Sequence, residues 1–388
     1  MVDFALTEAD RMVQRMAHEF AANEIRPVAA EFDEREEFPW DVARKGAALG
    51  LSGGAWGGPA ADELGITSLL IAEELAWGCG GFATAMLANG LAATAINVIG
   101  SDEQRTRWLP RCTPVNGELH LGALGLTEPE SGSDAGGLQT SAVRDGDDYV
   151  LNGSKRFITG GGISEIHVIF ATENPGTGFK GVSAFVVPTD TEGFSQGTVW
   201  KKMGIRASHT ADLILDNVRV PADHRLGAPE PDFRSGGRGA LGTLLATRPW
   251  IAAMAVGIGR AAFEYAARYA REREQFGRPI IDNQGVGFML ADMDINLDAA
   301  RLLTWRAGWM ITRGEPCTLE EASKAKAFAA DATMKVTTDA VQVCGGLGFM
   351  REVPVEKWMR DAKIFQIYEG TSQIQREVIA RNIAQRQF

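Results

Sequence analysis

The chain has 388 residues, 45% of them hydrophobic and 23% charged, which is ordinary for a soluble globular protein and excludes disorder over most of its length. A formal net charge of −11 disfavours nucleic acid and anionic membrane surfaces as partners. The four cysteines and five histidines are scattered without ligand spacing, so the sequence predicts neither a disulfide framework nor a metal site.

The chain is expected to be cytoplasmic. Its first residues are acidic and lack the basic region of a signal peptide. The most apolar stretch, 85–99, is interrupted by Asn89, Thr94 and Asn97, and we interpret it as too short and too polar to span a bilayer. The length predicts two or three domains.

Residues 1–119 are predicted to form an α-helical domain. Thr7 is followed three residues later by Asp10, a spacing typical of a helix N-terminus, and apolar residues then recur at helical intervals. The other predicted helices are 66–77, 82–99 and a short helix that follows a capping box of Ser101 and Gln104 and ends near Pro110.

Residues 120–232 are predicted to form a β domain, either a barrel or a sandwich. Turn-forming pairs such as Asp145-Gly146 and Asn152-Gly153 are frequent in this region. Short strands between frequent turns indicate an antiparallel sheet. The predicted strands are 149–151, 166–172, 182–187 and 211–215.

Residues 233–388 are predicted to form a four-helix bundle, because long segments there alternate apolar and polar faces. The segment 228–242, rich in glycine and proline, is the expected mobile connection. The order α, β, α makes the chain a multidomain α+β protein. The predicted helices of the bundle are 249–276, 286–312, 319–344 and 371–385.

One motif is a false lead. Residues 257–262 match GxGxxA, the dinucleotide-binding fingerprint, which functions only between a strand and a helix N-terminus. Here the preceding residues already belong to a predicted helix, so the N–H groups that would bind a pyrophosphate are occupied. Small residues inside a helix favour close helix packing instead.

Two turn-rich segments are candidate cofactor sites. Segment 122–140 is dense in Thr, Ser and Gly, whose hydroxyls and N–H groups can hold phosphates or the polar edge of a cofactor ring. Segment 156–162 sets an aromatic residue and a hydroxyl beside three glycines, which could flank a flat ring. On these residues alone, a polar connection and a simple strand end with its turn remain open alternatives.

Two charged candidates lie in the C-terminal part. Glu369 follows an apolar, aromatic stretch directly before a predicted helix, and a desolvated carboxylate has a raised pKa and can act as a proton-abstracting base. A structural role is the alternative, because the helix dipole favours acids at this position. In 268–279, Arg273 could bind a phosphate and Phe276 could stack on a ring, although a solvated helix end explains the same charges.

Six motifs follow one another along nearly the whole chain. They are Thr127-Glu128-Pro129 with Gly132-Ser133-Asp134, Asn152-Gly153-Ser154-Lys155 running into Phe157-Ile158-Thr159, Met203-Gly204-Ile205-Arg206 with Ser208 and Thr210, Gln275-Phe276-Gly277 with Gln284, Gln342-Val343-Cys344-Gly345-Gly346, and the run from Arg360 through Tyr368-Glu369-Gly370-Thr371 to Gln375. Together they resemble the acyl-CoA dehydrogenase family, in its short- and medium-chain flavoprotein branch. The family's architecture of a helical domain, a β-barrel and a four-helix bundle agrees with the order of elements predicted above.

The resemblance implies FAD-dependent α,β-dehydrogenation of an acyl-CoA thioester to trans-2-enoyl-CoA, a reaction of fatty acid β-oxidation. Glu369 falls on the family's catalytic base, which would remove the pro-R α-proton while the β-hydrogen leaves as hydride to flavin N5. Arg248 matches a family arginine that orients this base. The developing enolate oxygen needs hydrogen-bond donors, which in the family are the backbone N–H of the base and the flavin ribityl 2′-hydroxyl.

The resemblance also implies contacts of this subunit to FAD and to CoA. The residues expected along the isoalloxazine, over its other face and after the base are Leu124, Leu126, Thr127, Ser133, Phe157, Ile158, Thr159, Thr371 and Gln373. The expected substrate contacts are Ser133, Arg248, Gly370 and Arg381.

A second set of residues resembles those that reach the FAD of a neighbouring subunit. This sharing implies a homotetramer built as a dimer of dimers, with an electron-transferring flavoprotein as the electron acceptor. The residues of this set are Arg273, Phe276, Gln284, Gln342, Gly345 and Gly346.

Three residues depart from the family pattern, and two other functions compete. Phe157 replaces a common tryptophan, Leu245 stands where medium-chain members often carry aspartate, and Glu130 replaces a small residue. An oxygen-reactive oxidase or monooxygenase of the same fold is the nearest alternative function. A flavin-bearing binding protein is the other, although it would need a basic groove. Acyl chain length, branching and the choice between CoA and acyl carrier protein stay open.

Overall fold

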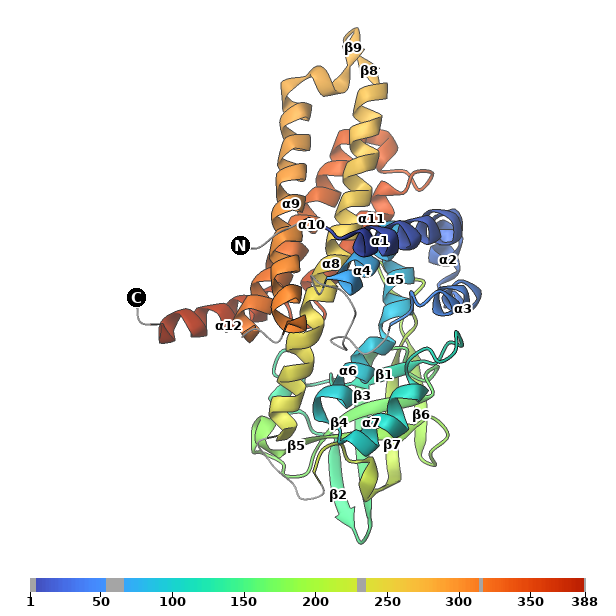
Figure 1. Ribbon diagram of the computed structural model, residues 1–388, viewed down its shortest axis with the longest axis vertical. Helices are drawn as coiled ribbons and strands as arrows, with labels where there is room; N and C mark the ends of the chain where they lie inside the picture. Colours follow the sequence, from blue (N-terminus) through green and yellow to red (C-terminus); the bar gives the residue numbers. More distant parts are fainter. Residues whose placement is uncertain (1–4, 54–65, 229–234, 314–316, 387–388) are drawn as a thin grey trace.

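The computed structural model describes residues 5–53, 66–228, 235–313 and 317–386. Figure 1 shows three parts: the N-terminal helices lie beside the long C-terminal helices, and the β sheet lies at one end of the molecule. The predicted order α, β, α is confirmed. The second predicted domain boundary, 232/233, lies outside the described residues.

The N-terminal helices begin where their caps predict. Thr7 and Asp10 form the capping box of the first helix, with Asp10 N donating to Thr7 Oγ1 at 3.1 Å, and Gln104 N donates to Ser101 Oγ at 3.2 Å in the second box. The predicted helix 82–99 is divided into two at Ala88. The helices are α1 (Glu8–Phe20), η1 (Ala21–Ile25), η2 (Arg26–Val28), α2 (Ala29–Arg35), α3 (Trp40–Ala48), α4 (Thr67–Gly78), α5 (Gly80–Leu87), α6 (Asn89–Ile99), α7 (Asp102–Trp108) and η3 (Leu109–Arg111).

The middle sheet is mixed, so the prediction of a purely antiparallel sheet is wrong. Strand β4 pairs parallel with β1 and, at one position, with β2. The chain leaves β1 and runs through the β2–β3 hairpin before β4, so it returns in the same direction, as parallel pairing requires. The order is β1-β4-β2-β3-β7-β6, with β5 on β4. The strands are β1 (Gly122–Gly125), β2 (Ser141–Asp145), β3 (Asp148–Thr159), β4 (Ile166–Thr172), β5 (Val182–Pro188), β6 (Phe194–Val199) and β7 (Thr210–Pro221).

Strand β4 is buried on both faces because it separates two cores. Val168 and Phe170 belong to a core shared with Ile96 of α6, whereas Ile169 and Ala171 belong to the core inside the curled sheet. Alternate residues of a strand point to opposite faces, so a continuous apolar run is needed here. This packing fixes β1, which pairs with β4 and contacts α6.

The C-terminal helices pack lengthwise on one another, with the short α12 crossing α10 and projecting sideways (Figure 1). Helices α8 and α9 are joined by a small hairpin, β8 (Glu274–Gln275) and β9 (Arg278–Pro279), followed by η7 (Ile280–Asp282). The helices are α8 (Ser235–Glu272), α9 (Gln284–Thr312), α10 (Leu319–Gly348), α11 (Val355–Ala362), η8 (Lys363–Gln366) and α12 (Ser372–Gln385).

The predicted start of α8 at residue 249 is wrong, because the helix begins at Ser235 and contains Pro249. A proline inside a helix removes one backbone hydrogen bond. Here the surrounding residues Arg248 and Trp250 are buried, and tertiary packing outweighs that local cost. Of the predicted mobile segment, residues 229–234 lie outside the described residues and 235–242 are helical.

The GxGxxA motif lies inside α8, as predicted, and serves helix packing. A Cβ at Gly257 would collide with the carbonyl oxygen of Glu73 on α4. A Cβ at Gly259 would lie 2.7 Å from Leu297 Cδ2 on α9. The glycines therefore allow close helix contact, and the N–H groups needed for a pyrophosphate are engaged in the helix.

Two segments, Gly80–Ile99 and Gly239–Glu272, are long and apolar enough to cross a membrane by length and composition. The stretch 85–99, expected to be too short and too polar, is the C-terminal part of the longer apolar segment Gly80–Ile99. However, 72% and 78% of the residues in their apolar windows are buried inside the protein. Their apolar composition is accounted for by the core that they build.

The motif that starts at Met203 locks the middle domain onto α11. Ile205 N donates to Asp361 Oδ1 at 2.5 Å, and Arg360 Nη1 donates to Met203 O at 3.0 Å. Asp361 is fully buried and also pairs with Lys357 at 2.5 Å. Because α11 leads through η8 to the loop around Glu369, this joint ties the sheet to that loop.

Candidate active site

Glu369 lies in a tight loop between η8 and α12. Its φ is 54° and that of Gly370 is 88°, so two successive residues adopt the left-handed conformation. For a non-glycine residue this costs roughly 1–2 kcal/mol, which the surrounding contacts must offset. Thr371 then caps α12, with its Oγ1 accepting a hydrogen bond from Ile374 N at 3.2 Å. The sequence prediction that Glu369 directly precedes a helix is confirmed.

The Glu369 carboxylate is desolvated by its neighbours. Burial raises its pKa above the usual value, while a hydrogen bond from Thr247 and the charges of Arg248 and Lys326 partly oppose the rise. Thr247 Oγ1 donates to Glu369 Oε2 at 2.8 Å. A carboxylate with a raised pKa binds a proton more readily, which suits a general base.

Arg248 is buried beside this carboxylate. Its Nη1 donates to Ser323 Oγ at 2.8 Å, and burial lowers its pKa to about 10, so it stays protonated at neutral pH. A Cβ at Gly370 would lie 3.5 Å from Arg248 Nη2 and 2.7 Å from Gln375 Nε2. Glycine at 370 therefore serves both the backbone conformation and the close approach of these two side chains.

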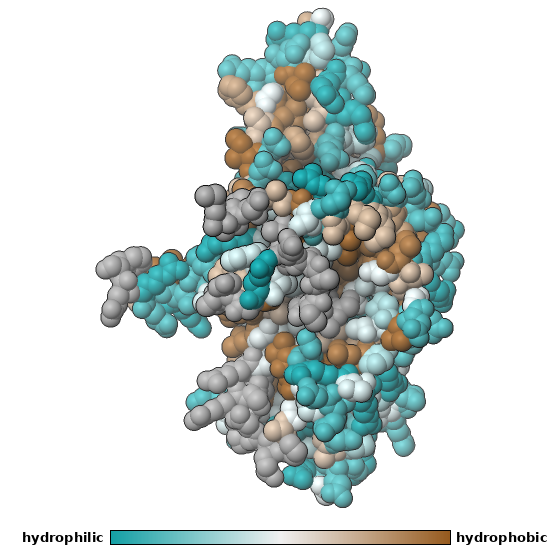
Figure 2. All heavy atoms as spheres, in the orientation of Figure 1, coloured by the Kyte–Doolittle hydropathy of each residue, from teal (hydrophilic) through white to brown (hydrophobic). Residues whose placement is uncertain are grey.

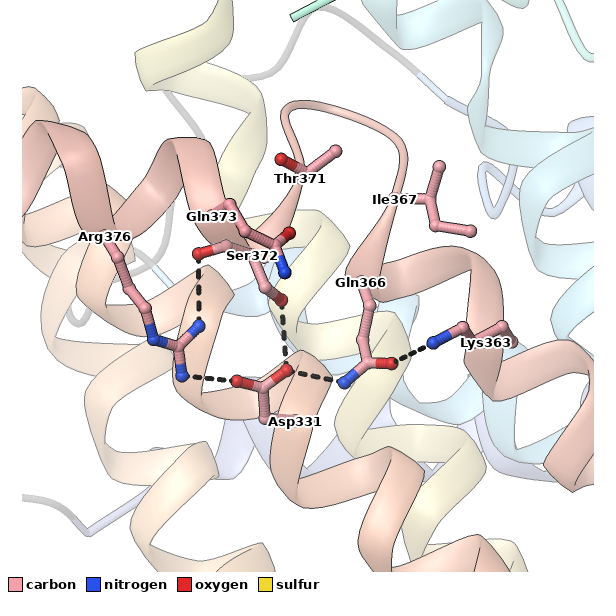
Figure 3. A pocket seen from close by; sticks show the side chains of 8 residues that line it. All are labelled: Asp331, Lys363, Gln366, Ile367, Thr371, Ser372, Gln373 and Arg376. Carbon is pink, nitrogen blue, oxygen red and sulfur yellow. Dashed lines mark hydrogen bonds and ion pairs between the residues drawn. The ribbon is translucent and has the colours of Figure 1, made fainter.

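Two further polar residues contact the loop from α10 and were not predicted from the sequence. Lys326 Nζ donates to Gly370 O at 2.6 Å. Asp331 accepts hydrogen bonds from Gln366 Nε2 at 2.6 Å and Ser372 Oγ at 3.0 Å, and it pairs with Arg376 at 2.6 Å (Figure 3). Thr371 and Gln373, two expected cofactor contacts, line the same cavity of about 470 Å³.

The first group of expected flavin contacts lies in β1 and in the residues directly after it. Leu124, Leu126 and Thr127 are half-buried, whereas Ser133 is exposed. A buried ion pair fixes the backbone here: Lys155 Nζ lies 2.6 Å from Glu128 Oε1, and Lys155 also donates to Leu126 O at 3.3 Å. Glu128 in addition accepts from Thr140 N at 2.9 Å and Gln139 N at 2.6 Å.

Phe157, Ile158 and Thr159 end β3 and face different ways. Phe157 has φ 59° at a register shift between β3 and β7, and 54% of it is exposed. Its ring lies 5.2 Å from that of Trp200, centroid to centroid. Ile158 is only 4% exposed and belongs to the core of the sheet, so its side chain points away from a ligand on the Phe157 side. Thr159 is half-buried.

The second group of expected contacts lies at the other end of the molecule, where the β8–β9 tip stands far from the sheet (Figure 1). Arg273, Gly345 and Gly346 line one cavity of about 530 Å³ between the end of α8 and the end of α10. Phe276 is 93% exposed on the tip, and Gln284 and Gln342 are also exposed. The two groups within one chain are therefore not brought together.

Arg381 lies apart from both groups. It is exposed on α12 and pairs with Glu377 at 2.7 Å. At about 1.5 Å per residue, it lies roughly 14 Å along α12 from Ser372. The structure of this chain does not bring it to Glu369.

The second cavity fits the diphosphate end of a nucleotide cofactor. In the described part of the chain, the exposed guanidinium of Arg273 makes no ion pair. Gly345 has φ 59° and ψ −139°, a conformation essentially restricted to glycine that interrupts the helical backbone. A free guanidinium and non-helical backbone suit a phosphate ligand. Among the described residues, no group of three His, Cys, Asp or Glu side chains could hold a metal ion.

Family models match the chain from end to end. The N-terminal, middle and C-terminal domains of acyl-CoA dehydrogenase match residues 7–115, 123–218 and 234–384, respectively. The chain belongs to the acyl-CoA dehydrogenase family. It is therefore an oxidoreductase that binds FAD, as the sequence motifs predicted.

Individual relatives are similar to this chain over nearly their full lengths. A protein named short-chain-specific acyl-CoA dehydrogenase from Clostridium acetobutylicum is 42% identical, with 98% of this chain and 100% of the relative covered. The solved butyryl-CoA dehydrogenase from Megasphaera elsdenii has 38% identity and a TM-score of 0.93, with 99% and 100% covered. A solved glutaryl-CoA dehydrogenase from Mycobacterium smegmatis in complex with FADH2 has 29% identity and a TM-score of 0.89, with 98% and 96% covered.

Proposed function

We propose that the protein dehydrogenates an acyl-CoA thioester between its α and β carbons, giving trans-2-enoyl-CoA, with Glu369 as the base. The observation that supports this most directly is the desolvated Glu369 carboxylate, held by Thr247 in a left-handed loop beside Arg248. The relatives that are named as short-chain and butyryl-CoA dehydrogenases support a short acyl chain.

The Glu369 carboxylate takes the α-proton of the thioester, and the electron pair of that C–H bond becomes the new C=C bond as the β-hydrogen leaves. Bound FAD supplies the hydride acceptor at its N5 atom. The α-C–H is a very weak acid, so its removal needs hydrogen-bond donors at the thioester oxygen. Among the described residues, the Glu369 N–H donates to no other group and is available for this oxygen.

The other residues of the site hold the base and the cofactor in place. Arg248 keeps a positive charge beside the carboxylate, which stabilises the base in its ionised form before the reaction. The Lys155–Glu128 pair fixes the end of β1 and the residue after it, where Leu124 and Leu126 are expected to contact the flavin. Phe157, exposed and paired with Trp200, is suited to cover the far face of a flat ring.

The assembly is part of the proposal. Arg273 follows the last residue of α8 and lies 25 residues, roughly 37 Å along the helix, from Arg248 beside Glu369, so each complete site would combine two subunits. Figure 2 shows apolar surface at the helical end of the molecule. Phe288 and Ile295 of α9 are 62% and 66% exposed. We propose a homotetramer of two such dimers, with an electron-transferring flavoprotein as acceptor.

The decisive experiment is anaerobic mixing of the FAD-loaded protein with acyl-CoAs of increasing length, followed through the flavin absorbance. A short acyl-CoA is expected to bleach the flavin, and E369Q is expected to keep FAD but to bleach slower by several orders of magnitude. Normal bleaching by E369Q would exclude Glu369 as the base. Rapid reoxidation of the bleached enzyme by air would instead favour the oxidase alternative.

A further inference from the structure

The loop that carries Glu369 is held by two side chains of α10. Lys326 reaches Gly370 from this helix, and five residues later Asp331 reaches both flanks of the loop, at Gln366 and Ser372 (Figure 3). Five residues turn a helix by about 140° beyond one full turn, so the two side chains leave α10 in different directions and reach different parts of the loop. Helix α10 therefore holds the loop at three residues: Gln366 before Glu369, and Gly370 and Ser372 after it.

Lys326 is unusual because its side chain is fully buried and forms no ion pair with a carboxylate among the described residues. In the described part of the chain its hydrogen bond goes to a neutral acceptor, the Gly370 carbonyl oxygen, at 2.6 Å. A buried ammonium costs several kcal/mol unless nearby charges stabilise it, and an apolar residue of the same length would avoid that cost. A lysine at this position therefore suggests a role that a methionine could not fill.

Three charged groups face Lys326: Glu369 on the loop, Arg248 on α8 and Asp331 on α10. Burial lowers the pKa of Lys326 to about 7, with Glu369 and Asp331 opposing this and Arg248 adding to it. A neutral amine still has two N–H groups, so the bond to Gly370 survives deprotonation and only the positive charge is lost.

We propose that Lys326 is a positioning residue of the base: it fixes Gly370, and thereby Glu369, and its charge keeps the neighbouring carboxylate ionised. The inference rests on the proposed function, because it assigns to Lys326 a role in proton abstraction by Glu369. A purely structural lysine would instead affect only folding.

The test compares K326M and K326Q with K335M in the FAD-loaded enzyme. Met removes the bond and the charge, whereas Gln keeps a donor for Gly370 and removes only the charge. Lys335 lies on the same helix, is 54% exposed and pairs with Asp339, which makes K335M the matched control. The measurements are FAD retention, the melting temperature and the pH dependence of kcat/KM.

Removing a positive charge beside Glu369 raises the pKa of that carboxylate, so the acid limb of the profile is expected to move to higher pH. An opposite charge within a few ångströms shifts a pKa by about 1–3 units, and we expect about 1 unit for both variants. K326M is also expected to lose at least tenfold in kcat, and K326Q less, because its donor remains. K335M should leave both quantities unchanged.

Acid limbs of K326M and K326Q that coincide with that of the unmodified enzyme would overturn the inference. If K326M does not fold, the K326Q profile alone decides. Failure here leaves the proposed function intact, as long as E369Q is inactive. An active E369Q removes the proposed function itself, whatever the profiles of the Lys326 variants show.

Discussion

The hydrogen bond from Thr247 to Glu369 gives a quantitative prediction. Val replaces Thr with nearly the same shape, so T247V removes the hydroxyl that donates to Glu369 Oε2 at 2.8 Å and leaves no cavity. A hydrogen bond to an ionised group contributes about 1.5–3 kcal/mol, and one pKa unit corresponds to about 1.4 kcal/mol. The bond stabilises the ionised carboxylate, so its loss should raise the Glu369 pKa by about 1–2 units.

The assay is the pH dependence of kcat/KM in the FAD-loaded enzyme. The acid limb of T247V is expected to lie about 1–2 units higher, with a smaller loss at high pH, where the carboxylate is ionised in both proteins. T243V is the matched control, because Thr243 is also buried in α8 and its hydroxyl donates within the helix to Gly239 O at 2.9 Å. A T247V profile identical to that of T243V would refute the reasoning.

Three further variants test other parts of the site. E369Q should have a higher melting temperature than the unmodified protein at neutral pH. Burial raises the folded-state pKa of the Glu369 carboxylate, so the stability that its protonated form contributes is lost as the pH rises through that pKa. The advantage of the amide should vanish near about pH 4, and a melting-temperature difference that does not change with pH would contradict this. E128Q leaves Lys155 buried without its carboxylate and should lower the free energy of unfolding in urea by about 3 kcal/mol, with loss of FAD, whereas E130Q at the exposed neighbour should change neither. R273A should lower the flavin-to-protein absorbance ratio after gel filtration, while R271A, also exposed near the end of α8, should not; an R273A protein that stays fully yellow counts against the phosphate assignment.

The sequence predicted those features of the fold that depend on neighbouring residues. The capping boxes at Thr7 and Ser101, the turns of the middle domain and the helix that follows Glu369 all depend on a few consecutive side chains. The start of α8 was missed because proline signals a helix end locally, whereas burial of Arg248 and Trp250 decides the outcome. The parallel pairing of β1 with β4 was missed because it depends on the path of the chain between them.

The candidate site also contains one residue that the sequence could identify and others that it could not. Glu369 could be singled out from its apolar surroundings and from the family resemblance. Thr247 could not, because it lies 122 residues earlier in the chain, inside a helix with no local sign of a partner. Lys326 stands in an alanine-rich helix where a lysine indicates a solvated face, yet it is fully buried. Only the packing of α10 against the loop gives these residues a role.

The separation of Arg273 from Glu369 has a consequence for hybrid assemblies. Under the proposed arrangement, an E369Q subunit paired with an R273A subunit concentrates both defects in one active site and leaves the other with neither. Co-expression of two individually defective chains would then restore part of the turnover, as intersubunit complementation does in other enzymes with shared sites.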